Sequence, residues 1–430
     1  MQPRFGPIRG RFAILDPLGS SRMHASTTNF LTIAASDRHA DTRTAALAVA
    51  ATLRETLPAP PQAVLVIASF HHAAVVPEAV RTIRESLDGP ATVGFTARSL
   101  MEGSEEFDRG PALAAMAVAG PGMRARAFRF DHRDGPPEAW SRDLVRSRLR
   151  PMSPPRGVMV FGDPFSTGST ALPARLADAV LPGVPVCGGL LSGASQAGAN
   201  VLVADEDVSN SGAVGLVLEG DVEVESVVSH GVRGVGPMLV VTEADAGGIS
   251  ELSGRPAATV LDEVLAELPG QDRTTLGRTP LFGLAIDATK PQQGRGDFLV
   301  RPIAAVDRRS GTLLTTNRVP RGSTLQFQVR DATIAAQDLD MSLDLAILDD
   351  RPPAGILLAG SAGRGASLFG ASGHDAGRIH ERLGGPPLLG FEAAAEIASI
   401  GGRPRIAGLG LSAMLLRGRR NRLNLSEDSR

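Results

Sequence analysis

The chain has 430 residues, 43% of them hydrophobic, and its 44 basic and 46 acidic residues leave a formal net charge of −2. This length can form two or three domains with substantial cores, and the near-neutral charge without a basic block makes nucleic acid and anionic lipid poor default partners. No apolar run reaches the roughly 18 residues of a membrane-spanning helix, and the start lacks the apolar stretch of a signal peptide. We therefore expect a cytoplasmic protein with no nucleic-acid or membrane partner.

The sequence offers little of the chemistry that common enzyme classes need. Cys187 is the only cysteine and Lys290 the only lysine, which excludes an internal disulfide and a zinc site with several thiolates. The chain also lacks a G-K-[ST] phosphate loop, a G-x-S-x-G elbow and an H-E-x-x-H pair. We expect no metal and no cofactor, and we favour a binding function over an enzymatic one.

Three segments share one plan of strand, helix, strand and closing strand. Each begins with a continuous apolar run, at residues 63–69, 157–163 and 355–361, which is typical of a strand buried on both faces. An amphipathic helix and a second apolar strand that ends in glycine follow. Because parallel strands joined by a helix form crossovers, the sequence predicts a two-part α/β protein. Its mixed sheets are built from repeated strand-helix-strand units, with helices packed on the sheets.

The stretch between the second and third segments departs from this plan. Apolar runs at 222–244 predict strands, and residues 255–268 predict a helix. Four short strands with turn residues between them, within residues 280–330, then predict an antiparallel meander.

The polar segment 270–278 separates that helix from the meander, and we interpret it as a domain boundary. It divides an N-terminal domain at 23–270 from a C-terminal domain at 278–417. Residues 1–22 and 418–430 carry no periodic pattern, so we expect the first to be disordered and the second to be a flexible tail.

Several short motifs, in a fixed order along residues 25 to 417, resemble the FIST family. This is a two-part sensory module of bacterial signalling proteins and of a eukaryotic F-box protein. The matching motifs are Ser69-x-His71-His72, Gly94-Phe95, residues 186–193, Ser229-His230-Gly231-Val232-Arg233, residues 252–257, Leu299-Val300-Arg301, Gly363-Arg364-Gly365 and Gly390-Phe391 with Glu396.

The resemblance implies an N-terminal and a C-terminal sensory region and a small ligand such as an amino acid or a derivative. It implies no established enzyme activity. Two residues depart from the family pattern. Ala362 stands where the family often has a cysteine, which counts against thiol chemistry in that loop, and Ala395 stands where the family tends to have a glycine.

Ligands of such sheets lie beyond the carboxyl ends of the strands, which directs attention to the polar residues there. The candidate ligand-binding residues are Ser69, His71, His72, Asp163, Ser166, Gly188, Gly189, Ser192, His230, Arg233, Arg301, Gly363, Arg364, Gly365 and Glu396. Each also has a structural interpretation: the glycines permit close packing, and the arginines need partners wherever they are buried. Glu392 and Glu396 lie four residues apart, which on a helix places them on one face and suits either binding of an amine or, as we favour, salt bridges to arginine.

These observations favour a sensory protein that binds an amino acid or small carboxylate between its two halves. One alternative is a hydrolase or transferase that uses His71 or His72 with Ser69 or Ser166. Another is a scaffold for a separately encoded signalling protein, which would expose an apolar patch.

Overall fold

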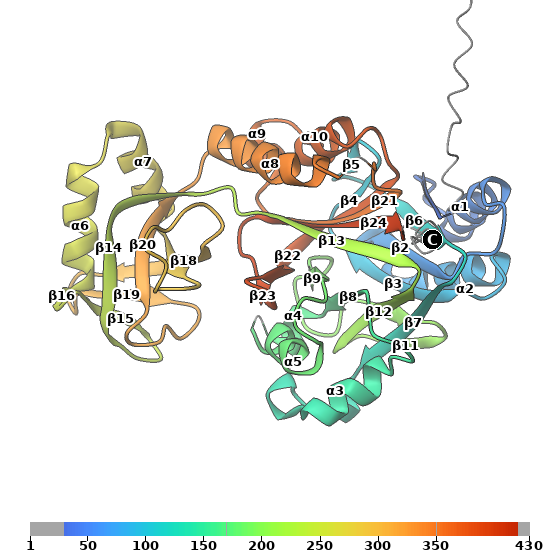
Figure 1. Cartoon of the computed structure of the whole chain (residues 1–430), viewed down its shortest axis with the longest axis horizontal. Helices are drawn as coiled ribbons and strands as arrows, with labels where there is room; N and C mark the ends of the chain where they lie inside the picture. The colour runs from blue at the N-terminus through green and yellow to red at the C-terminus, as the bar shows by residue number, and fades with distance from the viewer. Residues whose placement is uncertain (1–29, 169, 350, 420–430) are drawn as a thin grey trace, which may run out of the picture.

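The computed structural model describes residues 30–168, 170–349 and 351–419. Two sheets pack face to face in a large lobe, and a third sheet forms a small lobe beside it (Figure 1). The segment 1–22 lies outside the described residues, as do residues 420–430 of the expected tail. No helix in the described ranges is long and apolar enough to cross a membrane.

The first sheet of the large lobe has six strands and carries two helices on its outer face. The strand order is β1 (Leu31–Asp37), β6 (Leu113–Ala119), β2 (Ala63–Ser69), β3 (Ala91–Ala97), β10 (Leu202–Ala204) and β11 (Asp207–Ser209). The helices are α1 (Thr42–Thr56) and α2 (Val76–Ser86), and the 3-10 turn η1 (Phe70–Val75) precedes α2. Leu53 and Ile83 of these helices share a core with Val64 and Val66 of β2.

The second sheet has eleven strands. Its main path is β13 (Val222–Ser229), β24 (Leu411–Gly418), β21 (Gly355–Ser361), β22 (Leu388–Ile400), β9 (Val186–Leu191), β8 (Gly157–Gly162), β12 (Ala213–Gly220) and β7 (Met123–Phe130). Attached to β22 are β23 (Arg403–Ile406) and β4 (Leu100–Glu102), and β4 pairs with β5 (Glu105–Phe107).

Helices cover the outer face of this second sheet. One group comprises η2 (His132–Asp134), η3 (Pro137–Ala139), α3 (Arg142–Leu149), α4 (Pro164–Thr167) and α5 (Ala171–Ala179). The other comprises α8 (Ala332–Ile347), α9 (Gly365–Phe369) and α10 (His374–Arg382). The α/β class with mixed sheets is therefore confirmed, and each sheet buries one face against helices and the other against its partner sheet.

The three strand-helix-strand segments have the same strand pairing. In each, the first strand pairs parallel with the second, as β2 with β3, β8 with β9 and β21 with β22. In each, the first strand also pairs antiparallel with the closing strand, which is β6, β12 or β24. That the three are copies of one repeated unit stays a prediction.

One phenylalanine from each of these segments meets between the two sheets. Phe95 of β3 lies 4.4 Å from Phe161 of β8 and 5.0 Å from Phe391 of β22, measured between ring centroids, and Phe161 lies 5.6 Å from Phe391. All three side chains are completely buried. Aromatic pairs at this spacing stabilise a core beyond the area they bury, so this cluster joins the first sheet to the second.

The small lobe contains a seven-stranded sheet and two helices around a separate core. The strand order is β14 (Arg233–Ala244), β20 (Thr324–Val329), β17 (Leu281–Ala285), β18 (Phe298–Asp307), β19 (Thr312–Thr315), β15 (Gly248–Leu252) and β16 (Arg255–Pro256). The pairings of β17 to β20 are antiparallel, as the turn-rich stretch predicted. The helices are α6 (Ala257–Glu267) and α7 (Gly270–Arg278).

The segment 270–278, interpreted above as a domain boundary, is helix α7. Its sequence is polar, but Leu276 is completely buried in the core of the small lobe, and Asp272 forms an ion pair with Arg233 of β14. Strands from both sides of this segment belong to one sheet, so a boundary there would divide a single core.

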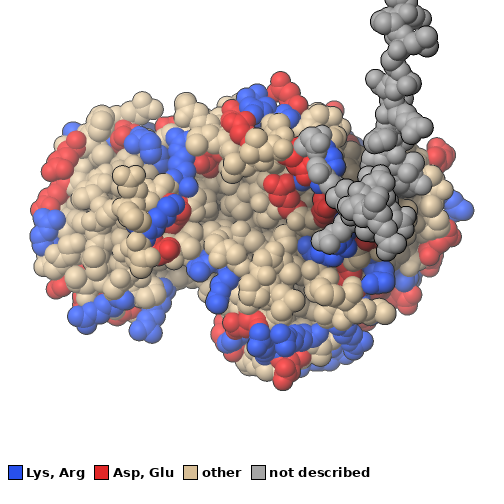
Figure 2. Space-filling model, in the orientation of Figure 1, with Lys and Arg blue, Asp and Glu red and all other residues tan. Residues whose placement is uncertain are grey.

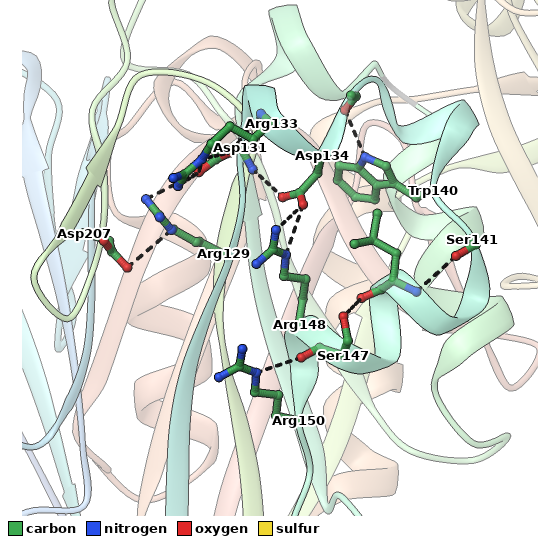
Figure 3. Close-up of polar contacts among 12 residues, drawn as sticks. Arg129, Asp131, Arg133, Asp134, Trp140, Ser141, Ser147, Arg148, Arg150 and Asp207 are labelled. Atoms are coloured by element: carbon green, nitrogen blue, oxygen red, sulfur yellow. Dashed lines mark hydrogen bonds and ion pairs between the residues drawn. The ribbon is translucent and has the colours of Figure 1, made fainter.

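A network of ion pairs fixes the segment between β7 and β8 (Figure 3). The Asp131 carboxylate accepts hydrogen bonds from Arg133 and lies 3.4 Å from Arg129, and the pKa of Asp131 is strongly lowered, chiefly by the Arg133 bonds. Asp134 accepts from Arg148 of α3, and its other oxygen accepts from the backbone N–H of Asp131 at 3.0 Å. These contacts hold α3 against the edge of the second sheet.

Replacement of Phe95 tests the contact between the sheets. Phe95→Ala should lower the free energy of unfolding by about 3–5 kcal/mol, because it opens a cavity in a fully packed core. The matched control is Phe70→Ala, since Phe70 is 44% exposed on η1 and should change stability by less than about 1 kcal/mol. Urea unfolding of both variants measures the change in the free energy of unfolding. Equal losses of stability would contradict a role for Phe95 in joining the two sheets.

The buried carboxylate of Asp134 provides a second stability test. Its side chain is 3% exposed, so Arg148→Ala leaves it without its ionic partner and should cost about 1–3 kcal/mol. The control is Arg142→Ala, an exposed residue in the first turn of the same helix, with an expected change within about 0.5 kcal/mol. Thermal unfolding is the measurement, and an Arg148→Ala protein as stable as the control would show that the pair is dispensable.

Candidate functional site

A cavity of about 540 Å³ lies where β3 and β21 end, and we name it the junction cavity. One wall comes from residues 98–109, where the chain passes from the first sheet into β4 and β5 of the second. The other wall comes from residues 358–367 and the start of α10, with Glu392 and Leu411. Its volume falls within the range of about 300–1,000 Å³ that is usual for small-molecule sites.

The base of the junction cavity contains a buried ion pair. Arg364 donates from Nε to Oδ2 of Asp375 and from Nη2 to Oδ1, the second bond at 3.0 Å. Burial by itself would raise the pKa of Asp375, but His374 and the Arg364 guanidinium hold it below its usual value. The Arg364 guanidinium also lies 5.5 Å from the centre of the Phe369 ring, which stacks on His374. The pair is therefore ionised and fixed in position.

Glu106 ties the two walls together. Its Oε2 accepts from the backbone N–H of Gly373 at 2.7 Å and from the Ser372 hydroxyl at 3.0 Å, and its Oε1 accepts from Ser99 at 3.3 Å. These bonds connect β5 to the turn before α10. The carboxylate thus sets the width of the cavity and has little capacity left to bind a ligand.

Glu392 and Arg98 are oppositely charged groups at the cavity that form one long ion pair with each other. Burial raises the pKa of Glu392, and Arg98 opposes that rise from a distance of 3.6 Å. Glu392 Oε1 is buried and accepts no hydrogen bond within the described residues, whereas Arg98 is largely exposed. Ser192 positions both, because its hydroxyl donates to the backbone carbonyl of Glu392 and accepts from the backbone N–H of Arg98.

Behind the base, several buried polar atoms have no hydrogen-bond partner within the described residues. They include both carboxyl oxygens of Glu396, Nη1 of Arg364, Nδ1 of His230 and Nε of Arg330. Burial raises the pKa of Glu396 to about 7, although the Arg364 guanidinium opposes the rise. Burial also lowers the pKa of His230. His230 therefore favours its neutral form near neutral pH, and Glu396 is only partly ionised there.

The polar loop residues that were singled out occupy different places in the fold. Gly363, Arg364 and Gly365 line the junction cavity, and Ala362 beside them presents a methyl group where the family often has a thiol. Arg330 donates to the carbonyl of Gly363 at 2.9 Å, which links this loop to the end of β20. Ser192 supports the cavity from outside, and Glu396 and His230 lie behind its base.

The two histidines after β2 lie away from the junction cavity. His72 is buried on η1, where Nδ1 is 2.8 Å from the Thr42 hydroxyl, and burial lowers its pKa. The Ser69 hydroxyl accepts from the backbone N–H of Ala112 at 3.0 Å, and His71 contacts His72 edge to face. Neither His71 nor His72 forms a hydrogen bond with Ser69 or Ser166 in the part of the chain that the structure describes, so the pairs that the hydrolase alternative names are not formed.

Residues of the second segment hold the structure together. Asp163 begins α4 by accepting from the backbone N–H of Ser166 at 3.0 Å, and it also accepts from Asn200 at 2.8 Å. A Cβ on Gly188, whose φ is +146°, would lie 1.9 Å from the Val160 carbonyl oxygen. A Cβ on Gly189 would lie 2.9 Å from Ala393. These glycines therefore permit close packing of β9 against its neighbours.

Two arginines and two glutamates need a revised description. Arg233 pairs with Asp272 in the small lobe, and Arg301 donates to the backbone carbonyl of Ile406, so it connects the two lobes. Glu392 and Glu396 lie on strand β22, which makes the helical placement wrong. A bulge between Ala393 and Ala395 separates them along that strand.

Residues of the wall 98–109 are the part of the cavity that motif reading missed. Arg98, Glu106, Asp108 and Arg109 lie in a short polar stretch with no glycine pattern. The acidic residues that follow Gly94-Phe95 were the one feature of the sequence that could have pointed to this wall. Cys187, by contrast, lies in the core with its pKa raised to about 12 by burial. No group of three His, Cys, Asp or Glu side chains that could hold a metal ion occurs in the part of the chain that the structure describes.

Comparisons with known proteins give two family matches that together cover most of the chain. The sequence profile of the FIST N domain matches residues 62–255, and that of the FIST C domain matches residues 257–399. An uncharacterised protein of Mycobacterium tuberculosis is 34% identical over 378 residues, which cover 87% of this chain and 96% of the relative. An uncharacterised protein of Mycobacterium bovis is 35% identical over 380 residues with the same coverage. The wall 98–109 lies in the first matched region, and the loop 361–367 lies in the second.

The Glu396 carboxyl makes stability depend on pH in a defined direction. The unfolded side chain loses its proton near pH 4.5, whereas the folded one keeps it up to about pH 7. Its contribution to stability therefore falls as pH rises from about 4.5 to about 7, by on the order of 3 kcal/mol. Glu396→Gln removes this dependence, so the variant should become more stable relative to the parent as pH rises.

Urea unfolding of the parent protein and Glu396→Gln between pH 5 and pH 8 measures this difference. The control is Glu251→Gln, because Glu251 is exposed on β15 and its substitution should shift stability equally at every pH. A pH-independent difference for Glu396→Gln as well would show that Glu396 is ionised throughout.

Proposed function

The chain belongs to the FIST family, whose two regions both contribute to the junction cavity, and on that premise we propose that it is a sensory protein for a small zwitterion. The proposed ligand is an amino acid or a closely related small carboxylate. The observation that carries the proposal is a cavity of suitable volume with charged groups of both signs on its walls.

The charges suggest how such a ligand would lie. A ligand ammonium group would bind to Glu392, whose Oε1 is buried and lacks a hydrogen bond, and Asp108 would add negative charge nearby. A ligand carboxylate would bind to Arg98, with Arg109 on the same wall, because guanidinium groups match carboxylates bidentately. Loss of the Arg98–Glu392 contact, which is long at 3.6 Å, would cost little.

The remaining surface of the cavity suits a short apolar side chain. Met101, Leu358 and Leu411 line it together with Ala366 and Ala376. The buried Arg364–Asp375 pair joins opposite charges through two hydrogen bonds and forms the base. A ligand held between Glu392 and Arg98 would connect the wall from the first matched region to the loop from the second, which is a suitable arrangement for sensing.

A screen of the twenty amino acids and of small dicarboxylates by thermal shift tests the proposal. A true ligand raises the unfolding temperature as its concentration exceeds its dissociation constant. We expect at least one amino acid with a short apolar side chain to do so at millimolar concentration. A flat response to every compound would contradict the proposal.

Calorimetric titration of the best ligand then locates the site. Glu392→Gln should weaken binding by about 10- to 100-fold, because it removes a charged hydrogen bond from a half-buried position. Glu251→Gln serves as the matched control and should bind like the parent. Equal affinities for all three proteins would place the ligand elsewhere.

A further inference from the structure

A second cavity of about 330 Å³ lies between the two lobes, and we name it the interlobe cleft. Leu299 and Arg301 of β18 line it from the small lobe, and residues 403–406 of β23 line it from the large lobe. Helix α5 forms the remaining wall through Pro173, Ala174 and Ala177. Figure 2 shows the notch between the lobes, with basic side chains on its wall.

Three arginines converge on this cleft: Arg301, Arg403 and Arg405. Within the described ranges, none of the three forms an ion pair with a carboxylate. Asp178 is the one acidic residue of the lining, and it lies 3.6 Å from Arg175. The cleft therefore holds an excess of positive charge.

Partial burial of Arg301 and Arg405 makes the uncompensated charge costly. Arg405 Nε is buried without a hydrogen-bond partner among the described residues. Burial lowers the pKa of Arg301, and the neighbouring Arg405 charge lowers it further. Glu396 opposes this effect from behind, but its own raised pKa leaves it only partly ionised near neutral pH. A bound anion would relieve both the repulsion and the missing hydrogen bond.

We infer that the interlobe cleft is a binding site for an organic anion with two or more negative oxygens, such as a dicarboxylate or a phosphate monoester. Guanidinium groups bind both classes through paired N–H donors. The apolar side of the cleft, which includes Leu299 and Ala174, would contact a short hydrocarbon body. This site is separate from the junction cavity, whose charges are of both signs, so the inference does not depend on the zwitterion proposal.

Calorimetric titrations with succinate, glycerol phosphate and inorganic phosphate test the inference at constant ionic strength, with chloride as the monovalent, single-atom comparison. At least one of the three anions should bind, and Arg405→Gln should weaken that binding at least 10-fold. Arg278→Gln is the matched control, since Arg278 is exposed in the last turn of α7 and lies outside the cleft. Binding of succinate identifies a carboxylate site, and binding of glycerol phosphate identifies a phosphate site.

Two results would overturn the inference: no anion binds the parent protein, or Arg405→Gln binds as tightly as Arg278→Gln. Arg403→Gln provides an independent arm, because Arg403 is exposed and its loss should not affect folding. The thermal shift that the best amino acid ligand produces in Arg405→Gln should equal the shift that it produces in the parent protein. Failure at one cavity is therefore distinguishable from failure at the other.

Discussion

The structure depends on the contact of two sheets through Phe95, Phe161 and Phe391. Each ring comes from a different strand-helix-strand segment, so the cluster joins parts of the chain that are nearly 300 residues apart. Both sheets are covered by helices on their other faces. Packing between the sheets thereby determines where a binding site can form.

The junction cavity lies where the chain passes from one sheet to the other. Arg98 and Ser99 follow β3 of the first sheet, and residues 361–365 follow β21 of the second. Glu106 bridges the two by accepting from Ser372 and Gly373. The two walls of the cavity thus join different sheets, so a shift of one sheet relative to the other would change the shape of the site.

Buried charge is concentrated in the same region. Arg364, Arg330 and Arg301 surround Glu396, and the raised pKa of that glutamate follows from its complete burial. Arg364 faces the junction cavity, whereas Arg301 faces the interlobe cleft. Glu396 thus lies between the two cavities, and its protonation state influences the charge at both.

The sequence predicted the buried strands because their apolar runs are continuous, as at residues 63–69 and 355–361. It misplaced Glu392 and Glu396 because Glu-Ala-Ala-Ala-Glu favours a helix, whereas pairing of β22 with β21 and β9 makes the segment a strand. Helix α7 escaped notice because Leu276 is its only buried residue.

The candidate site was predicted only in part, for a related reason. The glycines around Arg364 gave a local signal at one wall of the junction cavity. The wall 98–109 gave little sequence signal, because its charged residues become neighbours of that loop only when the two sheets pack together. The histidines after β2 looked equally suited to binding, yet His72 turns inward to Thr42.

A crystal structure of the protein grown with the amino acid that stabilises it most would test the central claim directly. The account predicts that the molecule lies in the junction cavity, with its ammonium group on Glu392 and its carboxylate on Arg98. A ligand bound at any other place, with the junction cavity holding only solvent, would contradict it.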